Sequence, residues 1–337
     1  YSFMNYMENV SDVSEYIIMM ESDMVIHQPI NPKRLGVRPG VVFSSQHNYL
    51  IGADNNFKTR FLVTDNPVDK VGGIYIFHKE DAKKIAPLWF AYTKKVKDFM
   101  VEYPEIYLQE TIENYDSVTR NEKKQAEWRC ELYGYIFAAS HLGIKHIISN
   151  DFLTYAGYNP IHQKVPSVIH YGIDFGVGEY SFQKMKHTNL NIKKCNNILF
   201  DNGHITSDSS KKDLVAIGTI DYLNGALCNY YESECNYKCD NNHIEKINND
   251  INYIKNTWNC IDEHSECVNW TNNGECNSNP LFMNNVCTNS CGLCKKNIDT
   301  RANYIIIGSF IFILVLVIQF FNRIYKDDKE NDKHHIV

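Results

Sequence analysis

The sequence predicts an α/β domain, a small disulfide-rich module and one membrane-spanning helix, in that order. Short apolar runs alternate with helical periodicity in the first half of the chain, and six of the eleven cysteines cluster ahead of a long uncharged apolar stretch. We therefore expect an α/β domain at 1–187, an asparagine-rich connector of unassigned structure at 188–259, a cystine module at 260–294, a membrane helix at 304–321 and a polar tail at 322–337.

Three apolar runs are the expected strands of the α/β domain. Tyr16–Met20 ends in charged residues, as a buried parallel strand does. Residues 74–77 follow a glycine pair, and residues 165–170 end in a histidine. The alternation of these runs with helical segments predicts the α/β class.

Two helices are expected between the strands. The first carries apolar residues every three or four positions from Ile85 to Phe99, with Pro87 in its first regular turn. The second runs from about Glu122 to Leu142 and ends at Gly143. Its apolar face should consist of Trp128, Leu132, Tyr135 and Ala139.

The connector differs in composition from the α/β domain. Segments 189–197 and 241–256 are rich in asparagine, which predicts linkers with little drive to fold. No role is assigned to the cysteines outside the module, which are Cys130, Cys195, Cys228, Cys235 and Cys239.

Charge and composition restrict the function. The apolar fraction of 44% is enough for a packed core, and a formal charge of −6 predicts no nucleic-acid partner. The chain starts at Tyr1 without a signal-like segment, so we expect that the true N-terminus is missing or was processed away. Few residues precede the first expected strand, so the N-terminal part of the α/β domain should be missing.

The apolar stretch at 304–321 is near the lower limit of the length that crosses a hydrocarbon core of about 30 Å. A buried core helix is the alternative. Basic residues on both sides leave its orientation open, but the clustered cysteines require an oxidising compartment. The part before the span should therefore be lumenal and the tail cytosolic. Possible glycosylation sites at Asn9 and Asn269 are compatible with that side.

The C-terminal tail suggests the compartment. Lys333 and His335 resemble a Lys-x-His-x-x retrieval signal that coat proteins bind, although an ordinary charged tail is an equal alternative. A short span also suits the thinner membranes of the early secretory pathway. These features predict residence in the endoplasmic reticulum or Golgi membrane.

Acidic residues follow the first expected strand. Ligands bind outside the carboxyl ends of strands in open α/β sheets. Glu21 and Asp23 could therefore both reach Mn²⁺ or Mg²⁺, which would stabilise a nucleotide diphosphate as a leaving group. Such acidic triplets are more often solvated loop charges.

Two further residues could carry chemistry. Glu131 lies beside the apolar face of the second helix, where a carboxylate could recognise sugar hydroxyls or transfer protons, but the pattern alone favours a surface glutamate. His170 could be a third metal ligand, and its spacing alone favours a core residue.

An ordered set of motifs resembles peptidyl-serine α-galactosyltransferases and hydroxyproline O-arabinosyltransferases. The matching segments are Tyr16 to Asp23, Thr64 to Val68, Gly73 to Ile76, Lys84 to Trp89, Trp128 to Tyr135, His146 to Phe152, Ile169 to Tyr171 and Gly178 to Lys184. Their shared order carries the resemblance. Ser22, Tyr180 and Gln183 depart from the family pattern.

The resemblance implies a partial GT-A-type fold and metal-dependent transfer from a UDP-sugar with retention of configuration. It implies Glu21, Asp23 and His170 as metal ligands and Glu131 as the catalytic carboxylate. The implied substrate-binding residues are Asn66, Trp128, Asp151 and Lys184. The acceptor would be serine or hydroxyproline of a secretory-pathway protein, and galactose the sugar. The alternative is a non-catalytic scaffold with a degenerate transferase domain.

The six clustered cysteines have the spacing of an ShK toxin-like (ShKT) module. Six cysteines allow 15 pairings, and spacing alone does not select one. The resemblance implies the pairs Cys260–Cys294, Cys267–Cys287 and Cys276–Cys291. A zinc site is the competing interpretation, but paired CxxC knuckles are lacking. A module this small depends on disulfides for stability, and in the scaffold alternative it would recruit partners.

Overall fold

The computed structural model describes residues 1–293, except 12, 114–125, 160–164, 207–208, 259–261, 263 and 265. The expected membrane helix and tail lie outside the described residues, as do Cys260 and Cys294. In the part of the chain that is described, no helix has both the length and the apolar character needed to cross a membrane.

A four-stranded sheet in the order β1-β4-β3-β5 organises the first half of the chain. Its strands are β1 (Tyr16–Met20), β3 (Val41–Gln46), β4 (Val71–His78) and β5 (Lys145–Ser149). Strand β4 is antiparallel to β1 and β3, and β5 is parallel to β3. Strands β1, β3 and β5 therefore run in the same direction, and their carboxyl ends lie at the same end of the sheet.

The α/β class is confirmed, but the prediction that β1 is a buried parallel strand is wrong. Its neighbour is the antiparallel β4. Four of its five residues are half-buried, and Ile18 is 36% exposed. An antiparallel strand can keep one side accessible to solvent, so an apolar run does not identify its pairing.

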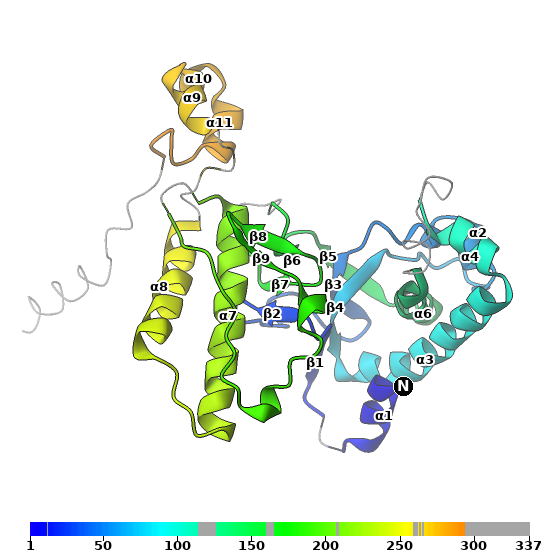
Figure 1. The fold of residues 1–337 in the computed structure, drawn as a ribbon. Coiled ribbons are helices and arrows are strands. Elements are labelled where there is room, and N and C mark those ends of the chain that lie inside the picture. The colour runs from blue at the N-terminus through cyan, green and yellow to red at the C-terminus, as the bar shows by residue number, and fades with distance from the viewer. Residues whose placement is uncertain are drawn as a thin grey trace, which may run out of the picture. The chain divides into compact units, whose positions relative to one another are not determined.

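Two long helices, α3 (Lys79–Glu102) and α6 (Arg129–Leu142), pack against each other and against this sheet (Figure 1). Their backbones approach closely at Gly134. A Cβ atom there would lie 2.1 Å from Oγ1 of Thr93 and 2.7 Å from its backbone nitrogen. Shorter elements complete this layer: α1 (Ser2–Asn9), the 3₁₀ turn Ile51–Ala53, α2 (Asn56–Thr59) and α4 (Pro104–Thr111).

The start of α3 and the apolar face of α6 differ from expectation. Helix α3 begins at Lys79, where a ring nitrogen of His78 accepts a hydrogen bond from the Glu80 amide, so Pro87 lies inside the helix and not in its first turn. Trp128 precedes α6 in the 3₁₀ turn Ala126–Trp128 and is 51% exposed. Gly143 ends α6 with φ +67°, which confirms that expectation.

A second sheet, in the order β2-β7-β6, packs against the first. It contains β2 (Met24–Ile26), β6 (Leu153–Tyr155) and β7 (Val168–His170). A hairpin of β8 (Phe175–Val177) and β9 (Tyr180–Phe182) follows, and then the 3₁₀ turns Lys184–His187 and Ile192–Lys194. The two sheets share an apolar cluster that includes Met24, Phe43, Ile76, Phe152 and Val168.

The asparagine-rich connector is folded, which corrects the expectation of weak folding drive. Helices α7 (Lys211–Glu234) and α8 (Asn241–Thr257) pack along each other (Figure 1). The buried side chains of Ile247 and Ile254 give α8 an apolar stripe despite its asparagines. Helix α7 has a complete Ser210–Asp213 capping box. Residues of α7 and α8 share a core with Ile169, Phe175 and Phe182.

Two disulfides explain cysteines that the sequence left unassigned. Cys195 pairs with Cys235, and Cys228 pairs with Cys239. Both bonds tie the end of α7 to neighbouring loops. Among the described residues, Cys130 is the free cysteine, and it is buried beside Tyr107.

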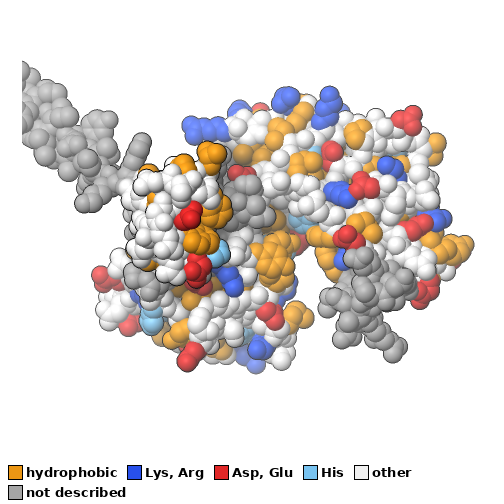
Figure 2. Space-filling view, turned by 90° about the horizontal axis from the view of Figure 1, so that it is seen from above, with side chains coloured by type: hydrophobic (Ala, Val, Ile, Leu, Met, Phe, Trp, Pro, Cys, Tyr) orange, Lys and Arg blue, Asp and Glu red, His pale blue; other side chains and the backbone are white. Residues whose placement is uncertain are grey.

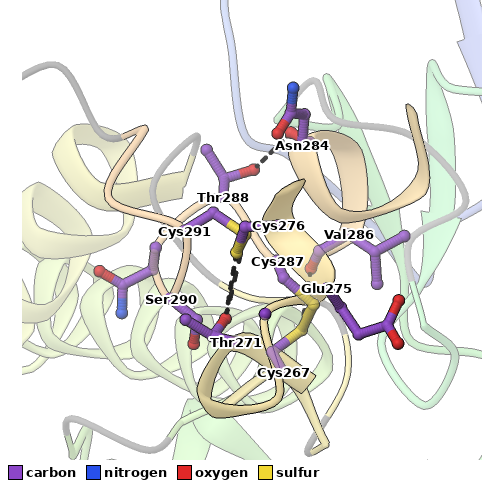
Figure 3. Close-up of a disulfide and its surroundings, with 12 residues drawn as sticks. Cys267, Thr271, Glu275, Cys276, Asn284, Val286, Cys287, Thr288, Ser290 and Cys291 are labelled. Carbon is purple, nitrogen blue, oxygen red and sulfur yellow. Dashed lines mark hydrogen bonds between the residues drawn. A yellow bond between two sulfur atoms is a disulfide. The ribbon is translucent and has the colours of Figure 1, made fainter. Parts of the chain in front are cut away.

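The cystine module contains α9 (Cys267–Asn272), α10 (Glu275–Ser278) and α11 (Pro280–Val286). Its disulfides Cys267–Cys287 and Cys276–Cys291 have the pairing that the ShKT resemblance implies (Figure 3). The half-cystines Cys267 and Cys287 are buried with Met283, so the sulfur atoms themselves form much of the small core. The cysteine sulfurs that are bound in these two disulfides cannot act as zinc ligands.

Positively and negatively charged side chains are intermixed on the surface. Figure 2 shows lysine and arginine side chains interspersed with aspartate and glutamate on the face seen from above. Both glycosylation candidates, Asn9 and Asn269, are exposed.

Candidate functional site

Three side chains from two distant parts of the sequence meet at one end of the sheets. Glu21 and Asp23 follow β1, and His170 is the last residue of β7. Nε2 of His170 lies 3.1 Å from Oδ1 of Asp23 and 3.3 Å from Oε2 of Glu21. One ligand atom from each residue lies within 4.8 Å of the other two. We call these three residues the acidic cluster.

Strand pairing explains why these residues converge. Met24 of β2 pairs with His170 of β7, which places Asp23 beside Tyr171. The Tyr171 amide donates a 2.9 Å hydrogen bond to the Asp23 carbonyl. Gly172 leaves the space that the imidazole needs, because a Cβ atom there would lie 2.5 Å from Nε2 of His170.

The two carboxylates have opposite pKa shifts. Burial raises the pKa of Asp23, but hydrogen bonds from His170 and Lys184 outweigh burial and hold the pKa well below its usual range. Burial is the largest effect on Glu21 and raises its pKa, with His170 opposing it and Asp23 and Glu131 adding to it. Asp23 is therefore an anion at neutral pH, and it forms an ion pair with Lys184.

The composition of the cluster fits a divalent cation. Carboxylate oxygens are the usual ligands of Mg²⁺ and Mn²⁺, and a neutral imidazole is a common additional ligand of transition metals. The ring of His170 packs against Tyr155, at 4.7 Å between ring centroids, so its orientation is restricted. Glu21, Asp23 and His170 are thus the residues that could hold such an ion.

A cavity of about 370 Å³ opens beside the acidic cluster. It is lined by Glu21, Asp23, Trp128, Glu131 and Lys184, together with Trp89 and neighbouring residues. Nε1 of Trp89 donates a 2.8 Å hydrogen bond to the Glu131 carbonyl, which ties α3 to the start of α6. The cavity combines carboxylates, one ammonium and aromatic faces. We call it the donor cavity, after the sugar donor that the sequence resemblance implies.

Two of the predicted substrate-binding residues do not line the donor cavity. The side-chain amide of Asn66 donates a 2.8 Å hydrogen bond to the Ser140 carbonyl near the end of α6, which is a structural role. Asp151 follows β5, accepts a 2.5 Å hydrogen bond from Ser149 and lines a different cavity. Gln183 donates to Asp174 and not to the acidic cluster.

Sequence reasoning missed His47, Tyr49 and Tyr155. His47 and Tyr49 follow β3, whose carboxyl end lies at the same end of the sheet as that of β1. Burial lowers the pKa of His47 to about 4, so its ring is neutral at physiological pH. Polar and aromatic residues directly after Val41–Gln46 could have indicated these positions. Neither β3 nor β5 is predicted from the sequence as a strand.

The chain is similar to curated proteins that are protein glycosyltransferases. A peptidyl serine alpha-galactosyltransferase of Arabidopsis thaliana is 33% identical over 186 residues, which cover 55% of this chain and 22% of the relative. A peptidyl serine alpha-galactosyltransferase of Chlamydomonas reinhardtii is 25% identical over 336 residues, which cover 84% of this chain and 43% of the relative.

Other comparisons extend this result. Hydroxyproline O-arabinosyltransferase 3 of Arabidopsis thaliana is 24% identical over 205 residues, covering 56% of this chain and 50% of that protein. Residues 259–294 match the family model described as ShK domain-like. No solved structure is significantly similar to the chain. The chain thus spans half or less of the length of these relatives.

Proposed function

We propose that this chain carries the catalytic site of a metal-dependent glycosyltransferase of the secretory pathway. It would transfer a sugar, galactose from UDP-galactose, to serine or hydroxyproline of a protein and retain the anomeric configuration. The observation that carries the proposal is the acidic cluster of Glu21, Asp23 and His170 at the mouth of a cavity that Lys184 and Glu131 also line. The names of the relatives supply the sugar and the acceptor.

The residues of the donor cavity have complementary roles in such a reaction. A bound Mn²⁺ or Mg²⁺ would neutralise diphosphate charge. Lys184 lies against Asp23 and could exchange this ion pair for a phosphate oxygen of the donor. Trp128 and Trp89 offer aromatic faces to the sugar ring, and Glu131 offers a carboxylate to its hydroxyls or to the reacting carbon.

The overall transfer exchanges one bond for another at the sugar. The acceptor hydroxyl oxygen bonds to the anomeric carbon, the bond from that carbon to the diphosphate oxygen breaks, and UDP leaves with the bonding pair. The hydroxyl proton passes to a basic oxygen in the cavity. A GT-A-type arrangement is consistent with acidic ligands at the carboxyl end of β1.

Donor binding and transfer test the proposal directly. Transfer of galactose from UDP-galactose to a serine-containing peptide should require Mn²⁺ and should stop when the metal is chelated. Glu131→Gln should reduce turnover by at least about 100-fold while UDP still binds in the presence of Mn²⁺. The control Glu127→Gln removes a carboxylate that does not line the donor cavity. If the full-length protein binds UDP and Mn²⁺ but transfers no sugar, the scaffold alternative gains support.

We also propose that residues 304–321 anchor the protein in the membrane of the endoplasmic reticulum or Golgi, with the folded part in the lumen. The four disulfides of the described residues support an oxidising compartment. A reporter that carries residues 298–337 should stay inside the cell and reach the surface once Lys333 and His335 are both replaced by serine. Identical localisation of both reporters excludes a retrieval signal.

A further inference from the structure

A second cavity, of about 620 Å³, shares no lining residue with the donor cavity. Its lining comes from the segments that follow the carboxyl ends of β3 and β5 and from β6. Tyr49, Tyr155 and Tyr158 contribute the aromatic surface. The proposed transfer assigns no role to this cavity, which we call the tyrosine cavity.

Two tyrosines connect the tyrosine cavity to the reaction site. Tyr155 packs against the metal-ligand candidate His170, with 4.7 Å between the ring centroids. Tyr49 packs edge-on against Trp128 of the donor cavity, with ring centroids 5.7 Å apart. The tyrosine cavity therefore adjoins the acidic cluster through Tyr155 and the donor cavity through Tyr49.

The lining does not suit a phosphate group. No lysine or arginine is among the described residues around the tyrosine cavity, whereas the carboxylates Glu113 and Asp151 are. His47 adds no charge, because burial lowers its pKa to about 4. The hydroxyl of Tyr155 can donate a hydrogen bond. A neutral ligand with hydrogen-bonding groups fits this lining.

The aromatic surface suits an extended chain that contains proline-type rings. Tyr155 and Tyr158 lie with ring centroids 5.4 Å apart and planes inclined by 45°, and Tyr158 is 58% exposed. Aromatic-lined grooves bind polyproline II segments, because these segments are stiff before binding and present apolar rings and free carbonyls. Side-chain amides such as those of Gln46 and Asn150 could donate to those carbonyls.

We propose that the tyrosine cavity binds the acceptor polypeptide as an extended, proline- or hydroxyproline-containing segment. Tyr155 and Tyr158 pack against its rings, and the segment then presents its hydroxyl group at the acidic cluster. The inference rests on the proposed function, because only a transferase needs an acceptor beside its donor site.

A binding experiment separates this inference from the proposed function. The probe is a synthetic peptide of alternating serine and hydroxyproline, titrated into the full-length protein without nucleotide. Tyr158→Ala should weaken peptide binding by about three- to tenfold, through the loss of one aromatic contact. UDP binding in the presence of Mn²⁺ should not change. Tyr253→Ala is the matched control, since Tyr253 on α8 is 41% exposed and does not line the cavity.

Each outcome has one meaning. Equal peptide affinity of the Tyr158→Ala and Tyr253→Ala proteins, or no peptide binding by the wild type, overturns the inference. Loss of UDP binding in Tyr158→Ala, or displacement of the peptide by UDP, shows that the cavity holds the donor and also overturns it. If the peptide binds in a Tyr158-dependent way but UDP and Mn²⁺ do not bind, the proposed function fails while the peptide site stands.

Discussion

Nε2 of His170 lies 3.1 Å from Oδ1 of Asp23, although the two residues belong to distant parts of the sequence. The pairing of β2 with β7 creates this contact, and Gly172 keeps the space beside the imidazole open. Metal binding by His170 and Asp23 would need that space as well as the ligand atoms themselves.

Gly172→Ala should therefore weaken Mn²⁺ binding. The added Cβ would lie 2.5 Å from Nε2 of His170, so the imidazole must move away from the carboxylates. We expect a loss of affinity of about tenfold, as is typical when the support of a metal ligand is disturbed. Free Mn²⁺ can be measured by electron paramagnetic resonance. Asp65→Asn, at an exposed acidic residue outside the cluster, is the control. Unchanged Mn²⁺ affinity in Gly172→Ala would contradict the assignment of His170.

The same glycine-to-alanine substitution should have opposite effects at two helical glycines, one at the close crossing of α3 and α6 and one on α7. Gly134→Ala places a Cβ 2.7 Å from a backbone nitrogen of Thr93, and the protein should lose about 1–3 kcal/mol of unfolding free energy. Gly225→Ala in α7 meets its nearest neighbouring atom at 4.0 Å and should gain about 0.5–1 kcal/mol. Urea unfolding measures both. A neutral Gly134→Ala would mean that the two helices separate easily.

A buried carboxylate on α7 should make stability depend on pH. Asp221 is 1% exposed, and burial raises its pKa to about 7, while Lys246 at 3.9 Å opposes the shift only partly. The folded state thus binds a proton more tightly than the unfolded state. This stabilisation is complete below the unfolded pKa of about 4 and is lost as the pH rises to about 7.

Asp221→Asn tests this dependence. The variant cannot ionise, so the difference in unfolding free energy between wild type and variant should shift in favour of the variant by a few kcal/mol from pH 4 to pH 7. Denaturant unfolding at several pH values gives the comparison. A constant difference across that range would show that Asp221 is already ionised in the folded protein. Asp213→Asn is an unsuitable control, because Asp213 caps α7; Asp98→Asn at an exposed site on α3 serves better.

The two disulfides at the end of α7 should contribute unequally. Cys195–Cys235 closes a loop with a sequence separation of 40, and Cys228–Cys239 one of 11. Loop-closure entropy predicts contributions of about 4 and about 3 kcal/mol. Replacing each cysteine pair by alanine and measuring unfolding in urea tests which disulfide contributes more. The wild type in the presence of a reductant is the reference. The reverse order would show that packing at the buried Cys228 outweighs chain entropy.

Features that depend on neighbouring residues could be predicted from the amino-acid sequence. Apolar runs located β1 and parts of β4 and β7, Gly143 marked the end of α6, and cysteine spacing indicated the disulfide-rich module. Short-range patterns suffice there, because backbone conformation and the closure of small loops are set locally. The order of motifs also pointed to the glycosyltransferase relatives.

Which of these residues meet became known from the three-dimensional fold. It brought Glu21, Asp23 and His170 together, placed Lys184 on the same cluster and left Asn66 as a support for α6. It also showed that the asparagine-rich connector forms α7 and α8, where a few buried isoleucines outweigh the polar composition. Sheet register and helix packing are set by contacts between distant segments, and the periodicity of a single segment does not encode its partner.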